Sequence, residues 1–163
     1  MVTPPHPEAS CRQNTRSSPR SPRTGLPLIP RGRAERTARC DDPAPGGLRA
    51  GIDQFNRGEY WECHETLEEI WRPEPEPVRY LYQGILLAGV GLYHLRRGNR
   101  RGALSKLRAG HALLAAYAPS CMGVDVARLR DDMARILVHI EGLDPHAPAL
   151  LAEGLAPVIV IAS

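Results

Sequence analysis

The residues of this chain best suited to chemistry are a histidine and two glutamates in one short stretch, His64, Glu65 and Glu68. His64 and Glu68 are four residues apart, so on an α-helix they share one side. An imidazole beside a carboxylate can bind a divalent metal ion or remove a proton as a general base. The spacing therefore marks a candidate polar cluster, and a metal held by His64 and Glu68 is one hypothesis for it.

A second apolar stretch places a fourth residue near this pair. Prolines at positions 73, 75 and 77 end the helix that carries His64, and the chain then turns back. Antiparallel helices about a turn centred near residue 74 set His64 level with residue 84. We therefore expect Gln83 to face His64 and Glu68. Three aromatic residues are expected to frame the cluster: Tyr60, Trp61 and Trp71.

Two interpretations of the cluster compete. In the structural one, Glu68 accepts a hydrogen bond from His64 and Gln83 satisfies the other ring nitrogen, so that the network fixes the helix register. In the functional one, His64 works with Glu65 or Glu68 in metal binding or catalysis. A zinc site needs three or four strong ligands, and His94, the next candidate, lies roughly 16 Å along the helix from Gln83. The structural interpretation is therefore favoured.

A group of arginines is the second candidate for binding. It surrounds the Gly98-Asn99 turn and consists of Arg96, Arg97, Arg100 and Arg101. Guanidinium groups beside a helix N-terminus can hold a phosphate or a carboxylate. Arginine-rich turns are also ordinary solvated surface, and this second interpretation is favoured.

Hydrophobic periodicity predicts an all-α fold, a compact bundle of about five helices. The expected helices cover residues 48–56, 59–71 and 78–97, a fourth capped by Asn99, and a fifth from Asp125 to Gly142. The third is nearly apolar and is expected to be central. It carries small residues at helical spacing, Gly84, Ala88 and Gly91, which would let a neighbouring backbone approach closely. The fourth carries His111 within a leucine stripe, which indicates a core or interface histidine.

The chain contains a faint internal repeat. A shift of 40 residues pairs Gly58 with Gly98, Cys63 with Ala103, and Leu67 with Leu107. Both copies then read as helix, glycine turn, helix. We therefore expect helical hairpins that weakly resemble tetratricopeptide repeats.

The most distinctive stretch runs from Phe55 to Trp71 and reads F-N-R-G-E-Y-W-E-C-H-E-T-L-E-E-I-W. It resembles the opening signature of the domain of unknown function 309 family, which consists of small helical proteins. The likeness continues through Gln83-Gly84, His94, Gly98-Asn99 and Gly102-Ala103, and covers about residues 48–140. The resemblance implies an all-helical fold, and it brings no established activity.

The two ends of the chain differ from its middle. Residues 1–47 hold nine prolines and almost no periodic apolar residues, which predicts a disordered tail rich in arginine, proline and serine. Residues 1–40 carry eight arginines against two glutamates, whereas residues 41–163 carry sixteen acidic residues against thirteen basic ones. The tail is open to three interpretations: a passive extension, a targeting segment or a start-site artefact. Residues 48–142 are the expected helical domain, and 143–163 a proline-containing segment packed on it.

The four cysteines, at positions 11, 40, 63 and 121, form no C-x-x-C pair. Their spacing predicts neither a zinc site nor a disulfide framework, so a reducing cytoplasm is the expected location. No apolar run reaches the roughly eighteen residues that a membrane span needs. Cofactors are not expected, with a divalent metal ion as the open alternative.

The preferred functional hypothesis is a non-catalytic helical module that binds a protein partner or forms a homo-oligomer. It is based on the hairpins, the apolar central helix and the lack of a complete catalytic set. The alternative is a small metal-binding protein or a hydrolase-type enzyme using His64, Glu65 and Glu68. Nucleic-acid binding is not expected beyond a weak contribution from the basic tail.

Overall fold

A computed structural model describes residues 32–162, and helices form most of this range, as predicted. Five α-helices are found in this range: α1 (Gly46–Asn56), α2 (Tyr60–Trp71), α3 (Arg79–Arg96), α4 (Arg100–Leu114) and α5 (Val126–Gly142). The same range holds two short 3-10 helices, η1 (Ala38–Asp41) and η2 (Ala115–Tyr117), and a two-stranded antiparallel sheet of β1 (Ser120–Cys121) and β2 (Val124–Asp125). Residues 1–31, the larger part of the predicted disordered tail, lie outside the described residues.

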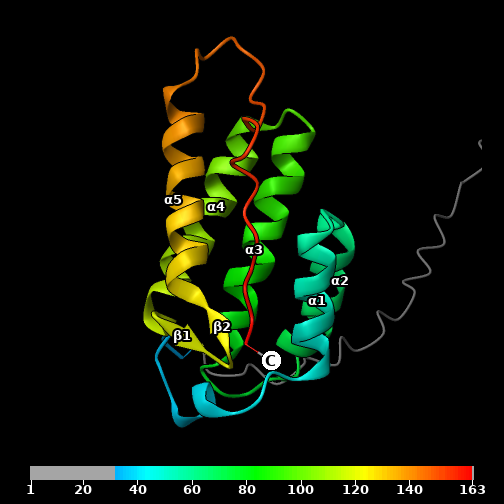
Figure 1. Ribbon diagram of the computed structural model, residues 1–163, viewed down its shortest axis with the longest axis vertical. Helices are drawn as coiled ribbons and strands as arrows, with labels where there is room; N and C mark the ends of the chain where they lie inside the picture. The colour runs from blue at the N-terminus through cyan, green and yellow to red at the C-terminus, as the bar shows by residue number, and fades with distance from the viewer. Residues whose placement is uncertain (1–31, 163) are drawn as a thin grey trace, which may run out of the picture.

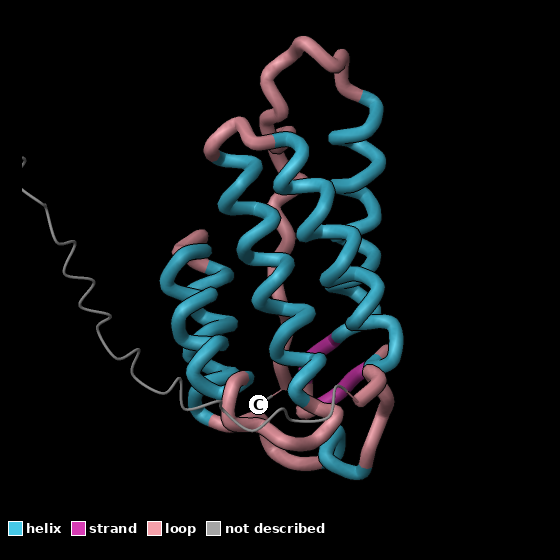
Figure 2. The backbone as a smooth tube through the Cα atoms, turned by 180° about the vertical axis from the view of Figure 1, so that it is seen from behind, coloured by secondary structure: helices cyan, strands magenta, loops and turns pink. Residues whose placement is uncertain are grey.

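The central element is α3, as its apolar sequence predicted. Helix α3 packs between α2 and α4, while α1 packs on α2 and α5 on α4 (Figure 1). A long extended segment follows α5 and runs back across α3 toward the β1–β2 hairpin, which the view from behind also shows (Figure 2). The core is therefore formed by two helical hairpins and α5, with this segment lying over one face.

The two helical hairpins turn in the same way. Gly58 and Gly98 have φ values of +76° and +70°, which glycine adopts without the steric cost of a Cβ. The amide of Gly58 donates to the carbonyl of Phe55 at 2.9 Å, and that of Gly98 donates to Leu95 at 3.0 Å. The turns after α1 and α3 are therefore equivalent, as the repeat predicts.

The packing inside each hairpin repeats as well. A Cβ added to Gly51 would lie 2.7 Å from Leu67 Cδ2, and one added to Gly91 would lie 2.6 Å from Leu107 Cγ. Both contacts join positions related by the 40-residue shift. The repeat thus includes a glycine–leucine contact that the sequence comparison had not singled out.

Helices α3 and α4 approach closely where small residues meet. A Cβ on Gly110 would lie only 2.8 Å from the backbone oxygen of Gly84, and one on Gly84 would lie 2.7 Å from Leu114 Cδ2. The predicted close approach along one side of α3 is confirmed.

The ordered chain begins before residue 47, contrary to the predicted tail boundary. Cys40 is buried and forms a disulfide with Cys121, and its carbonyl accepts a hydrogen bond of 2.7 Å from the amide of Met122. Arg36 donates to the carbonyl of Ser120. The expectation of no disulfide is also wrong, because spacing alone cannot reveal a pair of cysteines 81 residues apart.

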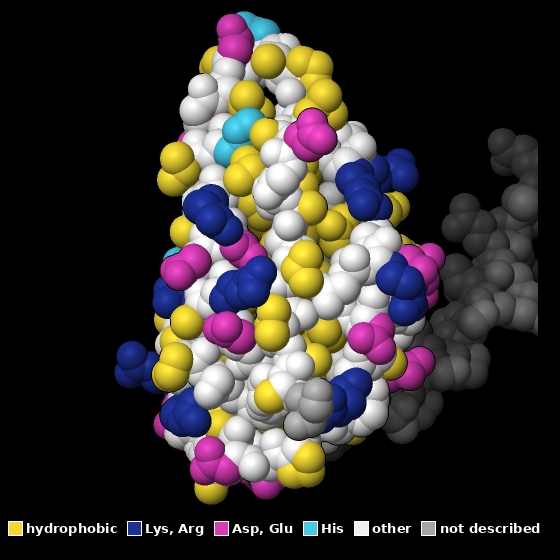
Figure 3. All heavy atoms as spheres, viewed as in Figure 1, with side chains coloured by type: hydrophobic (Ala, Val, Ile, Leu, Met, Phe, Trp, Pro, Cys, Tyr) yellow, Lys and Arg dark blue, Asp and Glu magenta, His cyan; other side chains and the backbone are white. Residues whose placement is uncertain are grey.

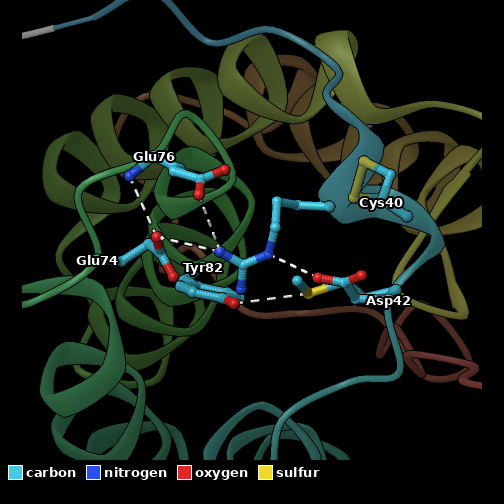
Figure 4. Close-up of polar contacts among 8 residues, drawn as sticks. Cys40, Asp42, Glu74, Glu76 and Tyr82 are labelled. Atoms are coloured by element: carbon cyan, nitrogen blue, oxygen red, sulfur yellow. Dashed lines mark hydrogen bonds and ion pairs between the residues drawn. A yellow bond between two sulfur atoms is a disulfide. The ribbon is translucent and has the colours of Figure 1, made fainter.

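An arginine joins this N-terminal arm to the proline-rich loop between α2 and α3. Arg39 Nε donates to Asp42 Oδ2 at 2.6 Å, and its Nη1 lies 3.5 Å from Glu74 and 3.6 Å from Glu76. Figure 4 shows these three carboxylates around the guanidinium, beside the ring of Tyr82. The arm is thus held both covalently and by charge.

None of the helices in the described range is long and apolar enough to cross a membrane.

We predict that Gly110→Ala destabilises the protein by about 1–3 kcal/mol, because the methyl group would strike the backbone of α3. Gly142→Ala is the matched control: a Cβ there meets nothing within 4 Å, so its free energy of unfolding should be unchanged or slightly raised. Urea unfolding of both variants measures the difference. Equal stabilities would contradict the close α3–α4 contact.

We also predict that Cys40→Ser lowers the free energy of unfolding by about 2–5 kcal/mol under oxidising conditions. The reason is that the disulfide restricts a long loop of the unfolded chain. Thermal unfolding with and without reductant checks this. Adding reductant to the natural protein should lower its free energy of unfolding by the same amount. Adding it to Cys40→Ser should cause no further loss.

Candidate functional site

Part of the distinctive stretch on α1 and α2 builds the core. Phe55, Tyr60, Cys63 and Leu67 are buried, and the rings of Phe55 and Tyr60 meet edge to face with centroids 5.3 Å apart. Burial raises the pKa of the Cys63 thiol to about 12, so it is not a thiolate at neutral pH. These residues position the rest of the stretch and do no chemistry themselves.

The predicted hydrogen-bonded network around His64 does not form. His64 Nδ1 is buried without a hydrogen-bond partner, and within the described chain no hydrogen bond joins His64 to Glu68 or Gln83. Glu68 instead accepts a hydrogen bond of 2.8 Å from Arg72, one turn further along the same helix.

The register of α2 against α3 explains the difference. Trp61 packs on Tyr93, with ring centroids 5.4 Å apart, and Cys63 Sγ would lie 3.6 Å from a Cβ on Gly89. These contacts set His64 level with the region of Gly89 and not with residue 84. Gln83, six residues before Gly89 on α3, therefore lies about 9 Å from the level of His64 along the helix axis.

The structure places a different set of residues beside His64. Trp61 stacks on His64 with centroids 5.2 Å apart and on Tyr93 at 5.4 Å, and Tyr93 packs against His94 at 6.2 Å. We call Trp61, His64, Tyr93 and His94 the aromatic row. Trp61 is 47% exposed, so the row opens to solvent at an indole that its neighbours hold in place.

The predicted aromatic frame is only partly correct. Trp61 does stack on His64, but Tyr60 is buried and faces Arg96, whose guanidinium lies 4.5 Å from its ring centroid. Trp71 lies at the far end of α2, where Arg79 stacks over it at 5.3 Å. The rings of Tyr60 and Trp71 therefore each make a cation–π contact with an arginine, away from His64.

The exposed side of α2 is acidic. Glu62, Glu65 and Glu69 are exposed, and the last two line a shallow depression of about 390 Å³ together with Glu68 and Arg72. Among residues 32–162, no three His, Cys, Asp or Glu side chains gather closely enough to hold a metal ion. The acidic side of α2 can attract a basic partner, and it supplies no ready ligand sphere.

The four arginines around the Gly98-Asn99 turn do not form one patch. Arg96 lies on Tyr60 and donates to the carbonyl of Gly58, and Arg97 lies over Tyr93 at 5.6 Å.

The other two arginines of the turn also differ from each other. Arg100 donates to the carbonyls of Leu143 and Asp144 at 3.1 and 3.0 Å, at the end of α5. Arg101 is exposed. Backbone carbonyls and aromatic faces thus engage three of the four guanidinium groups that were the candidate for anion binding.

Sequence reasoning missed Asn56. Its side chain makes two hydrogen bonds to the main chain of Ile159, accepting at 2.8 Å from the amide and donating at 2.9 Å to the carbonyl. Asn56 is the second residue of the F-N-R-G stretch, but nothing in the sequence shows that its partner lies 103 residues away.

Comparison with known proteins supports the resemblance drawn from this stretch. Residues 48–105 match the family described as "Domain of unknown function (DUF309)". A curated relative, the uncharacterized protein YpuF of Bacillus subtilis (strain 168), is 34% identical over 96 residues, 57% of this chain and 55% of that protein. An uncharacterized protein of Aquifex aeolicus (strain VF5) is 23% identical over 84 residues, 51% of this chain and 25% of that protein.

The matched stretches thus span about half of the first relative and a quarter of the second. No solved structure matches the chain at a significant level.

We predict that His64→Leu leaves the free energy of unfolding within about 0.5 kcal/mol of the original, because no hydrogen-bond partner would be left unsatisfied. Leu67→Ala is the control on the same helix and should cost about 2–5 kcal/mol by opening a cavity. Chemical unfolding measures both. A loss above about 1 kcal/mol in His64→Leu would point to a polar partner that holds the ring.

Proposed function

We propose that this protein, whose residues 48–105 match the DUF309 family, is a non-catalytic helical module that binds a protein through its aromatic row. The observation that carries the proposal is the half-exposed indole of Trp61, packed against His64 and Tyr93. The indole contributes little to the core, so a partner protein can bury its exposed part.

The geometry of the row suits a binding surface. Tryptophan and tyrosine dominate the binding energy of protein interfaces because they bury a large area with few rotatable bonds. Packing against His64 and Tyr93 already restrains the Trp61 ring. Little side-chain freedom remains to be lost when a partner covers it.

The charges beside the row indicate what kind of partner fits. Glu62, Glu65 and Glu69 are exposed on the same helix as Trp61. Carboxylates at the rim of an interface favour basic partners and speed their association at low salt. The partner we propose therefore offers an apolar pocket or patch for the indole, flanked by lysine or arginine.

A photo-crosslinking phenylalanine analogue at position 61 tests this proposal in cells that produce the full chain. We expect one discrete adduct after illumination, with a protein partner or with a second copy, and its mass distinguishes the two. The same analogue at position 138, where Val138 is 71% exposed on α5, is the matched control. No adduct at 61, or equal adducts at both positions, would contradict the proposal.

A metal-binding or hydrolytic role for His64, Glu65 and Glu68 is the second candidate. It is favoured by the unpaired buried Nδ1 of His64, an atom that a cation could satisfy. The ion pair between Glu68 and Arg72 argues against this second candidate, since that carboxylate already has a cationic partner.

Metal analysis of the purified full chain tests the second candidate. If it holds, the protein carries about one metal ion per chain, which His64→Ala abolishes and the control His139→Ala retains. If our main proposal holds, both variants match the natural protein and none carries stoichiometric metal.

The cytoplasmic location stays a prediction. The Cys40–Cys121 disulfide bears on it, because structural disulfides are rare where thioredoxin and glutathione keep thiols reduced. Trapping the thiols at the moment of cell lysis and counting them by mass would show which state the protein holds in the cell.

A further inference from the structure

The segment after α5 is bound along both of its edges by contacts to its main chain. On one edge it extends the β1–β2 hairpin: Asp125 N donates to Val160 O at 2.9 Å, and Ala162 N donates to Gly123 O at 2.8 Å. On the other edge the Asn56 amide makes its two bonds to Ile159. The β2 strand on one side and the Asn56 amide on the other both bind main-chain atoms. These contacts therefore recognise an extended backbone and do not depend on the identity of its side chains.

We propose that the groove bounded by α1, α3 and β2 is a binding site for an extended peptide of a partner protein, in which residues 149–162 are the resident occupant. The site is separate from the aromatic row and goes beyond the function proposed above. Main-chain pairing of this kind gives affinity, while pockets for alternate side chains give specificity.

The side chains of the resident segment define what such a peptide must carry. Ile159 is 2% exposed, whereas its neighbours Val158 and Val160 are 47% and 40% exposed. In Figure 3, hydrophobic side chains lie along the course of this segment on the surface. Pro157, two residues earlier, is buried as well. The ligand is therefore an extended peptide with an apolar residue at that position and isoleucine or valine at the position of Ile159.

The resident segment fills the groove only in part. Before Pro157 a pocket of about 370 Å³ remains between Tyr60, Leu92 and Leu95 of the helices and Leu150, Leu151 and Ala156 of the segment. The segment turns there at Gly154, whose φ is +79°. A peptide that continues straight along the groove, with a larger apolar side chain, would cover surface that the resident leaves open.

The two halves of the contact have different origins in the sequence. Asn56 lies inside residues 48–105, the range that matches the family, whereas Ile159 lies outside it. On the receiving side, Asn56 and α3 thus lie inside the matched range, whereas β2 and the resident segment lie outside it. A clamp that reads only main-chain atoms can accept a segment from a different chain.

The stretch that connects the resident segment to α5 is exposed. Arg100 fixes the carbonyls of Leu143 and Asp144 at the end of α5, and the exposed stretch Pro145-His146 follows. In our proposal this exposed stretch, which lies before the groove, is the hinge. Opening breaks the contacts of the segment and leaves the five helices packed.

Hydrogen exchange on the intact full chain is the first test. We expect the Ile159 and Ala162 amides to exchange at least about 100-fold faster than the buried amides of α3, because the segment opens locally. Asn56→Ala should speed exchange at Ile159 further and leave α3 unchanged. The control is Asp53→Ala, an exposed change on the same helix. Protection equal to that of α3 would make the segment an integral part of the fold and overturn the proposal.

Exchange of the segment for a free peptide is the second test. A protease site inserted between His146 and Ala147 of the full chain allows the linkage to be cut after folding. The cut protein should then bind a fluorescent peptide of residues 149–162 at least about tenfold more tightly than the uncut protein does, since the resident can leave.

Variants of both sides make this test specific. Ile159→Ala in the peptide and Asn56→Ala in the protein should each weaken binding about tenfold, whereas Val158→Ala in the peptide and Asp53→Ala in the protein should change it less than about twofold. Failure of the peptide to bind the cut protein would overturn the proposal. A dimer in which two uncut copies exchange their segments would also overturn it, by assigning the groove to a second copy.

Discussion

The close contact between α3 and α4 is the constraint on which the rest of the structure depends. It requires that Gly84, Gly91 and Gly110 carry no side chain, since each Cβ would meet a neighbour below 3 Å. Because the backbones approach this closely, α3 can lie in the middle of the bundle and pack on α2 with its opposite side. The positions of Trp61 and Tyr93 both follow from that arrangement.

The distinctive stretch serves two purposes at once. Its apolar positions hold α1 and α2 together, while Asn56 and Trp61, on the outside, each make a contact that is not needed for the core. Asn56 receives an extended chain, and Trp61 presents an indole. The same short stretch thus contributes to the core and to two separate surfaces. The lack of a complete catalytic set in the sequence did not reveal this double role.

The sequence predicted those features that depend on local spacing. Helix periodicity, the glycine turns and the small side of α3 are all local, and they were predicted correctly. The pairing of His64 with Gln83 failed although both helix ends were predicted to within one residue. The register of α2 against α3 is set by the side chains packed between them, Trp61 on Tyr93 and Cys63 against Gly89, which no local pattern shows. The Cys40–Cys121 and Asn56–Ile159 contacts join positions far apart in the chain, and no local pattern indicates them.

The disulfide divides the molecule in a way that the helix packing does not. Cys40 and Cys121 close a covalent ring around α1, α2, α3 and α4, whereas α5 and the segment that follows lie outside it. A mechanical pull on the two flanks of the chain would pass through the sulfur bridge and leave the ring unloaded. The force would fall first on the part outside the ring, which hydrogen bonds and packing alone hold to the body.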